Sequence, residues 1–171
     1  MEINTNKKSK NNNSTYIGID NGVNGGIVAM DESYNIIEKI TMPVFGKTKK
    51  EYDLYALSDF FKKYEHCHVI LEKAQPQFRD GKKQSFKTGF GYGAVQGLMA
   101  ALLIPFTIIA PKQWQKKVLA GLNTDNTKDA SILFCKRQWP CEDWTATERS
   151  RKEHDGMTDA ACLAYYGVIT R

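Results

Sequence analysis

The chain has few of the residues that cross-link or anchor small proteins. Its 171 residues include only four cysteines, none at C-x-x-C spacing: Cys67, Cys135, Cys141 and Cys162. A disulfide framework is therefore not expected, and a reducing, intracellular setting fits this cysteine usage better. No apolar run approaches the roughly 20 residues that cross a bilayer, because Pro105 interrupts the longest one. Residues 1–14 contain no apolar segment of a secretory signal, so we expect neither membrane insertion nor secretion.

Two motifs that commonly bind cofactors are incomplete. The glycine-rich turn Gly22–Gly26 joins two apolar segments and does not open a helix, which excludes a P-loop or a dinucleotide site. His66, Cys67 and His68 are adjacent on an expected strand, where neighbouring side chains point to opposite faces. We therefore expect no zinc site there and no small-molecule cofactor.

Composition predicts one folded domain with a polar tail. The apolar fraction of 42% and the charged fraction of 25% are ordinary for a globular protein, and the net charge of +5 is modest. Residues 1–14 are rich in Asn and Lys and lack hydrophobic periodicity, which predicts a disordered arm. Residues 15–171 are long enough to bury a core without cross-links, so we expect them to form the single domain.

Hydrophobic periodicity predicts a mixed α/β fold. Segments 15–20, 27–30 and 34–42 read as a three-stranded antiparallel meander, and 69–72 and 106–110 read as buried strands, the former in a central parallel position. Expected helices cover residues 52–64, 89–103, 111–119, 126–137 and 155–166. Residues 74–88 are polar and basic, which predicts a flexible lid, and 138–152 are irregular. The result is a mixed five-stranded sheet flanked by helices.

Four acidic residues occupy positions where a carboxylate is expensive to desolvate. Asp20 and Glu72 each end an apolar strand, and Asp155 and Asp159 lie one helical turn apart at the start of an apolar stretch. A shared cation would offset that cost, and hard oxygen ligands suit Mg²⁺, for which Mn²⁺ can substitute. Two such ions roughly 3.5–4 Å apart are the usual apparatus of phosphodiester hydrolysis. The acids therefore predict a nuclease with two metal ions.

The same segments resemble the RuvC family of Holliday junction resolvases, most closely its phage and chloroplast branch. The resemblance is carried by Ile17-Gly-Ile-Asp20-Asn-Gly, Ile70-Leu-Glu72-Lys, Ala110-Pro-Lys-Gln-Trp114 and His154-Asp-Gly-Met-Thr-Asp-Ala160. It implies a ribonuclease H-like fold and a homodimeric, Mg²⁺-dependent endonuclease that makes paired nicks in four-way junction DNA. It also implies the cytoplasm of a bacterial host for a phage-encoded protein, with an organelle as the alternative.

The spacing of the last two acids departs from the bacterial pattern. Bacterial members carry Asp-x-x-Asp, whereas here Asp155 and Asp159 are four residues apart and Gly156 holds the position three before Asp159. Both spacings keep two carboxylates on one helix face. His154 is an alternative ligand, and a helix N-cap is an alternative role for Asp155.

Basic and aromatic residues supply the expected DNA contacts. By position in the resembling motif, Lys116 is assigned near the metal as a catalytic residue and Lys128 to the junction backbone, with Lys112 nearby. The expected lid carries Arg79, Lys82, Lys83 and Lys87 for phosphates. Phe78 is the expected junction wedge, with Phe86 and Phe90 as competitors.

Three functional alternatives share this fold. The first is the junction resolvase, and the second is a ribonuclease H-type or single-strand nuclease without junction preference. The third is a non-catalytic nucleic-acid-binding derivative, which the presence of all four acids disfavours. Trp114, Trp139 and Trp144 are assigned to the core or to a dimer interface, and the small-residue helix 89–103 to either kind of packing.

Overall fold

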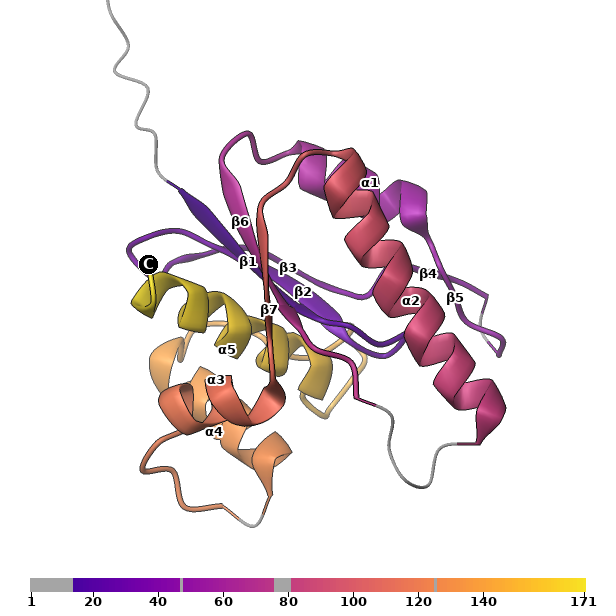
Figure 1. The fold of residues 1–171 in the computed structure, drawn as a ribbon. Coiled ribbons are helices and arrows are strands. Elements are labelled where there is room, and N and C mark those ends of the chain that lie inside the picture. Colours follow the sequence, from indigo (N-terminus) through magenta and orange to yellow (C-terminus); the bar gives the residue numbers. More distant parts are fainter. Residues whose placement is uncertain (1–13, 47, 76–80, 125) are drawn as a thin grey trace, which may run out of the picture.

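The protein folds around one mixed sheet whose strands follow the order β3-β2-β1-β6-β7 (Figure 1). The computed structural model describes residues 14–46, 48–75, 81–124 and 126–171. The strands are β1 (Thr15–Asp20), β2 (Gly26–Met30), β3 (Ile36–Thr41), β6 (Cys67–Glu72) and β7 (Phe106–Ile109). β1, β2 and β3 form an antiparallel meander, and β6 runs parallel to both β1 and β7. The predicted mixed sheet and the central position of β6 are confirmed.

Helices cover both faces of the sheet (Figure 1). One face carries α3 (Pro111–Val118), α4 (Thr127–Gln138) and α5 (Asp155–Ile169), and the other carries α1 (Leu54–Lys62) and α2 (Lys82–Ala101). Side chains of β1 point alternately to the two faces of the sheet and pack into two separate cores. Tyr16 packs on the α5 side, whereas Ile17 and Ile19 pack on the α1 and α2 side. The three tryptophans assigned to the core or an interface are all buried.

The prediction that the strand at residues 106–110 is buried is wrong. β7 is the edge strand of the sheet, and Thr107 and Ile108 are exposed to solvent. An apolar run such as Phe106–Ile109 reads as buried because composition does not reveal whether a strand has one neighbour or two. A second, two-stranded sheet of β4 (Val44–Phe45) and β5 (Glu51–Tyr52) was not expected, because two residues carry no measurable periodicity.

The predicted lid is wrong in its second half, because residues 82–88 are helix. α2 begins at Lys82, so Lys83 and Lys87 lie on its first two turns, and Gly81 precedes it as the N-cap. Lysine and glutamine are good helix formers, and the stretch 82–88 contains neither Gly nor Pro to interrupt it. Polarity, which suggested a loop, only indicates that this part of the helix is solvent-exposed. Phe78 and Arg79, and the tail apart from Ser14, lie outside the described residues.

A glycine in β1 allows α5 to lie directly on the sheet. A Cβ atom at Gly18 would be 1.9 Å from the carbonyl oxygen of Ala160 and 2.4 Å from the amide nitrogen of Ala164. No side chain fits such a gap, so the backbone of α5 packs against the backbone of β1. This close approach places the start of α5 beside the carboxyl end of β1.

Candidate metal centre

Asp20 and Glu72 lie side by side at the carboxyl ends of two parallel strands. β1 and β6 are paired up to Ile19 and Leu71, and the two acids are the next residue on each strand. Tyr16 and Ile70 pack into the α5-side core, so by alternation Asp20 and Glu72 face the same side. Asp20 and Glu72, which the sequence places at the ends of apolar strands, therefore lie at the same end and on the same face of the sheet.

The start of α5 is joined to the turn that follows Asp20. Gly25 and Gly156 form an isolated parallel bridge, and a Cβ atom at Gly156 would lie 2.6 Å from the backbone of Gly25. This contact explains why glycine occupies the position three before Asp159. An aspartate there would collide with the turn, so the flanking Asp155 is the acid that remains on this end of the helix.

His154, not Asp155, is the N-cap of α5, so the alternative role for Asp155 is wrong. The Nδ1 atom of His154 accepts a hydrogen bond of 3.2 Å from the backbone N–H of Met157. Asp155 is the first residue of the helix, where a carboxylate is favourable to the helix dipole. With Nδ1 committed to the cap, only Nε2 of His154 is available to a ligand.

The acids form one electrostatic cluster. Burial raises the pKa of Asp20 well above its ordinary value, and the charges of Asp159, Glu72 and Asp155 raise it further. Burial also raises the pKa of Asp159 to about 6, with additional raising by Glu72 and Asp155. Asp20 and Asp159 are therefore poorly solvated carboxylates whose pKa values the neighbouring acids raise further.

Unpartnered polar atoms accompany this charge. Within the described residues, Oδ1 of Asp159 and both amide atoms of Asn21 are buried without a hydrogen-bond partner. Burying such atoms lowers the stability of the folded protein unless a ligand supplies the missing contact. A hard divalent cation fits an oxygen-rich set of this kind. Across the same residues, however, no three His, Cys, Asp or Glu side chains have the geometry of a metal cage, so the acids are neighbours and not a closed coordination sphere.

Glu72 is held by a residue that the sequence did not single out for this role. The indole Nε1–H of Trp114, which is 1% exposed, donates a hydrogen bond of 2.9 Å to Oε1 of Glu72. Burial raises the pKa of Glu72, and this bond acts against the rise. A buried indole N–H needs an acceptor. The tryptophan on the helix after β7 was therefore the sequence feature that could have predicted a hydrogen bond to a buried acceptor. The bond leaves Oε2 of Glu72 available.

Lys128 is the ammonium group that contacts the acids. Its Nζ pairs with Oδ2 of Asp155, and this pair lowers the pKa of Asp155 despite burial. Lys112 and Lys116 lie on the exposed side of α3, and Lys116 forms no ion pair within the described part of the chain. The assignment of Lys116 near the metal stays a prediction.

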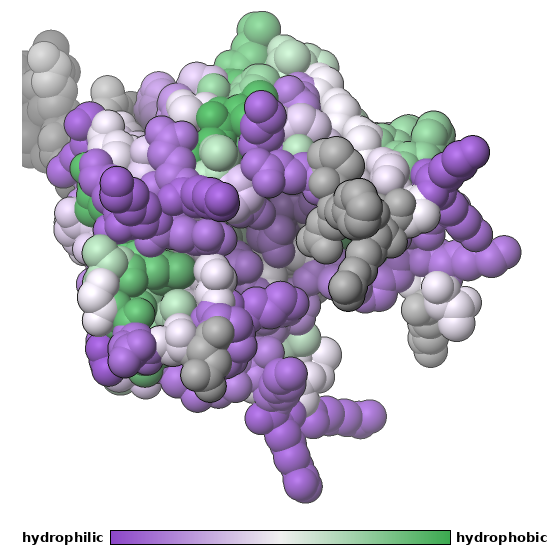
Figure 2. All heavy atoms as spheres, turned by 60° about the horizontal axis from the view of Figure 1, so that its bottom comes forward, coloured by the Kyte–Doolittle hydropathy of each residue, from purple (hydrophilic) through white to green (hydrophobic). Residues whose placement is uncertain are grey.

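Two cavities flank the cluster. One of about 300 Å³ includes Asn21, Glu72, Gln75 and Thr88 in its lining, and another of about 760 Å³ lies beside Asp155 at the start of α4. The lining of the second includes Lys128, Lys152 and His154. Hydrophilic side chains cover most of this end of the molecule (Figure 2).

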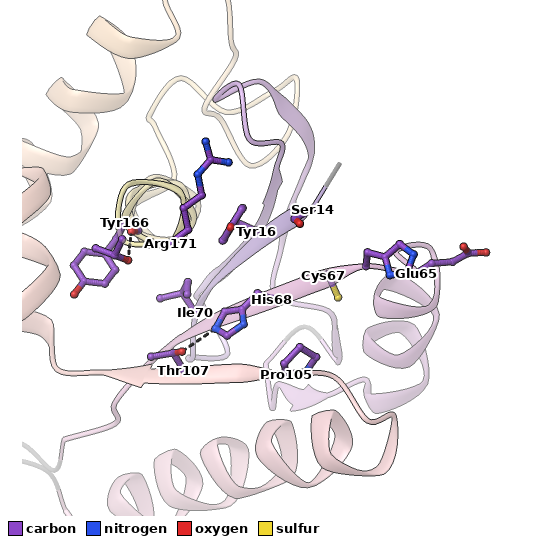
Figure 3. A pocket seen from close by; sticks show the side chains of 13 residues that line it. Ser14, Tyr16, Glu65, Cys67, His68, Ile70, Pro105, Thr107, Tyr166 and Arg171 are labelled. Carbon is purple, nitrogen blue, oxygen red and sulfur yellow. Dashed lines mark hydrogen bonds between the residues drawn. The ribbon is translucent and has the colours of Figure 1, made fainter. Parts of the chain in front are cut away.

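A third cavity, of about 750 Å³, lies at the other end of β6 (Figure 3). There Nε2 of His68 is 2.7 Å from Oγ1 of Thr107. Cys67 and His68 both line this cavity, although most of the Cys67 side chain is buried in the core on the α1 side. Among the described residues of its lining, Glu65 is the only acidic side chain, which does not match the centre described above. Within the described ranges, no helix combines the length and apolarity that crossing a membrane requires.

Comparison with known proteins identifies the fold. No protein-family model matches the chain, and no curated protein is similar to it in sequence. Thermus thermophilus RuvC in complex with a Holliday junction substrate is similar in structure, with 16% identity and a TM-score of 0.63 over 89% of this chain and 91% of that one. A second T. thermophilus RuvC structure has 20% identity and a TM-score of 0.50 over 89% of this chain and 92% of that one. The yeast mitochondrial Holliday junction resolvase Ydc2 has 14% identity and a TM-score of 0.60 over 91% and 78%. The fold is therefore ribonuclease H-like, as in RuvC, as predicted.

Proposed function

We propose that the protein is a metal-dependent endonuclease that resolves four-way DNA junctions by phosphodiester hydrolysis. The observation that carries this proposal is the gathering of Asp20, Glu72, Asp155 and Asp159 in one electrostatic cluster on a ribonuclease H-like fold. A purely structural role would not explain why burial and neighbouring carboxylates raise the pKa values of both Asp20 and Asp159. Residues 15–171 would form the nuclease domain.

Mg²⁺ is the proposed cofactor, with Mn²⁺ as a substitute and two ions per site. Asp20, Glu72, Asp155 and Asp159 would hold them, since each offers a hard oxygen and Oδ1 of Asp159 has no other partner. Bound ions would activate water and neutralise charge on the leaving oxygen.

The chain's own residues would orient the reacting groups. Trp114 fixes one oxygen of Glu72 and so sets the direction of the other. Lys128, released from Asp155 when a cation replaces it, would neutralise charge on the phosphate. Lys152 and the first N–H groups of α4 line the cavity beside Asp155, where a neighbouring phosphate of the strand would bind.

The proposed substrate is a four-way junction bound by a homodimer. The structure of T. thermophilus RuvC, to which this fold is similar, was determined in complex with a Holliday junction. Lys82, Lys83 and Lys87 on α2, with Arg79 before it, supply charge for the junction arms. Membership of the phage and chloroplast branch, Phe78 as the wedge, Lys112 as a DNA contact and catalysis by Lys116 belong to the same proposal.

Replacing one acid tests the proposal. We expect Asp20→Asn to abolish cleavage of a mobile four-way junction in Mg²⁺, while junction binding in Ca²⁺ stays within severalfold of wild type. Binding depends on the basic surface, which the substitution does not change. The matched control is Asp59→Asn, an exposed aspartate on α1 paired with Lys62, which should cut normally.

Substrate competition separates this function from its alternatives. The assay offers a junction, a linear duplex and an RNA–DNA hybrid together, and the product ends are mapped. Preferential cleavage of the hybrid would support a ribonuclease H-type enzyme instead. Equal loss of binding and cutting in Asp20→Asn would show that this carboxylate is structural.

A further inference from the structure

The two edges of the main sheet differ in how they are protected. The β3 edge carries Glu38 and Lys39, whose side chains form ion pairs with Lys63 and Glu142. Charged side chains of this kind keep an edge strand from pairing with another chain. The β7 edge, Phe106–Ile109, contains no charged residue. Within the described residues, no strand pairs with its outer side.

Backbone groups of β7 point outward from this edge. The N–H of Lys73 donates a hydrogen bond of 2.8 Å to the carbonyl oxygen of Ile109. In a parallel ladder every second residue of a strand faces the same neighbour, so Thr107 also faces β6. The N–H and C=O groups of Phe106 and Ile108 therefore point away from β6, toward the open edge.

Apolar side chains accompany the open edge. Ile108 is 40% exposed, and Leu103, three residues before β7, is 90% exposed. Leu103 has a positive φ of 57° at the position after the C-cap of α2, where glycine is usual. A leucine in this backbone conformation costs stability, and at this exposure it gains almost no packing in return. Exposed apolar groups beside an open strand edge are features of a surface that binds another polypeptide.

The third cavity opens beside the same strand (Figure 3). Its lining includes Thr107 of β7, His68 and Ile70 of β6, and Tyr166 of α5. Thr107 lies on the α5 side of the sheet, because it pairs with Ile70, which belongs to that core. A strand added to β7 would point every second side chain to this side. The cavity of about 750 Å³ has room for those side chains.

The charge around β7 selects an acidic partner. Residues 81–124, which include α2, β7 and α3, contain six lysines and no aspartate or glutamate. Lys112, Lys116 and Lys117 are exposed on α3, the helix that follows β7. Nζ of Lys117 is 5.7 Å from the ring centroid of Tyr166, which lines the third cavity. A negatively charged segment is attracted to this surface, whereas a second copy of the chain would bring the same lysines and be repelled.

We propose that the open edge of β7 binds an extended, acidic peptide segment of a partner protein by strand addition. The peptide backbone pairs with Phe106 and Ile108. Its acidic side chains point to the third cavity and Lys117, and its apolar side chains contact Ile108 on the opposite face. Backbone pairing requires a polypeptide, because DNA has no matching row of N–H and C=O groups. The inference goes beyond the proposed nuclease function, since none of the four acids takes part.

Amide hydrogen exchange of the full chain, followed by NMR, tests the pairing directly. The probe is a synthetic seven-residue peptide of alternating glutamate and valine with blocked ends. At a peptide concentration about 100 times the dissociation constant, exchange at Phe106 and Ile108 should slow roughly 100-fold. The amides of Thr107 and Ile109 already face β6 and should change little. A peptide of alternating lysine and valine is the control, and it should not bind.

Two alterations distinguish strand addition from other modes of binding. Ile108→Pro removes an outward N–H that the sheet does not use, and an edge strand tolerates proline at such a position. We expect it to weaken binding of the acidic peptide by roughly tenfold, whereas the matched control Ile108→Val keeps the N–H and should bind like wild type. N-methylation of alternate peptide amides requires no change to the protein. It should abolish binding when it blocks one edge of the peptide and have no effect on the other edge.

Several results would overturn the inference. They are absence of binding at millimolar acidic peptide, unchanged exchange at Phe106 and Ile108 when the peptide is bound, and equal binding of the acidic and basic peptides. Equal effects of methylation on both peptide edges would exclude strand pairing. Protection of the same amides by duplex DNA would assign the edge to nucleic acid. Protection that rises with protein concentration alone would assign it to a second copy of the chain, which also contradicts the proposal.

Discussion

Asp159 is the residue whose ionisation most directly reports on the proposed centre. Its pKa in the folded protein is about 6, against an ordinary value of 3.8, chiefly because of burial. The folded state thus favours the protonated carboxyl. A cation that binds the carboxylate must displace this proton, so metal binding should weaken below about pH 6.

The same shift predicts how stability depends on pH without metal. A raised folded pKa gives stability that is complete below pH 3.8 and lost as pH rises through about 6. For Asp159 the loss is about 3 kcal/mol, roughly half of it between pH 5 and 7.5. We therefore expect the free energy of unfolding to decline over that interval more in wild type than in Asp159→Asn.

Urea unfolding in EDTA at pH 5 and 7.5 measures this difference. His68 and His154 have lowered pKa values, which act in the opposite direction, and the comparison with Asp159→Asn cancels their contribution. Identical pH profiles for the two proteins would contradict the assignment of Asp159 to a crowded acidic site. Added Mn²⁺ at pH 7.5 should stabilise wild type more than Asp159→Asn.

The acids of the candidate site were more predictable from the sequence than the side chains that contact them. Asp20 and Glu72 could be predicted to lie together because both end apolar strands, and parallel strands end at the same edge. The buried indole of Trp114 needed an acceptor, but the sequence did not identify Glu72 as that acceptor, because the bond joins side chains of separate elements with no periodic relation. The unpartnered amide of Asn21 is likewise a property of packing alone.

At the scale of the elements, the packing of α5 on the sheet depends on Gly18, a residue of β1. A Cβ atom at Gly18 would overlap the backbone of α5 at Ala160. We expect Gly18→Ala to reduce the free energy of unfolding by about 3 kcal/mol, because the helix must move away from β1. Chemical denaturation followed by circular dichroism measures the change.

Gly89→Ala is the matched control for that substitution. Gly89 lies in α2, and nothing is within 4 Å of the position its Cβ atom would take. Alanine should stabilise this helix by roughly 0.5–1 kcal/mol. If Gly18→Ala were as stable as wild type, the direct backbone packing of α5 on β1 would be wrong.

Element types were predictable where periodicity is long, and boundaries were not. The strand Thr15–Asp20 and the helix starts at Pro111 and Asp155 agree with the sequence prediction. The first turns of α2 do not, because a solvent-exposed helix end has the polar composition of a loop. The exposure of β7 was also unpredictable, since it depends on which strand has no further neighbour.

At the scale of the whole molecule, we propose the open face of α2 as the surface that binds a second subunit. Gly93 and Gly97 lie one turn apart with nothing within 4 Å of their Cβ positions, so another helix can approach closely. We expect wild type to sediment as a dimer and Gly97→Arg as a monomer, because a long charged side chain prevents that approach. Analytical ultracentrifugation measures the two states.

The cleavage products of a four-way junction provide a second, independent test of the effect of Gly97→Arg on dimer formation. A monomer holds one active site, so Gly97→Arg should convert paired nicks into single ones on a supercoiled cruciform plasmid. The control Tyr55→Arg places the same charge on an exposed position of α1 and should stay dimeric. A dimeric Gly97→Arg would assign the interface to another surface.

The contact between Gly25 and Gly156 has a consequence for biosynthesis. It joins the second strand's turn to a helix that follows every other element, so two of the four acids join the rest only when that helix docks. A nascent chain still on the ribosome holds Asp20 and Glu72 long before it holds Asp155 and Asp159. Under the proposed function, the polypeptide therefore cannot cleave DNA until α5 has been synthesised and has docked on the sheet.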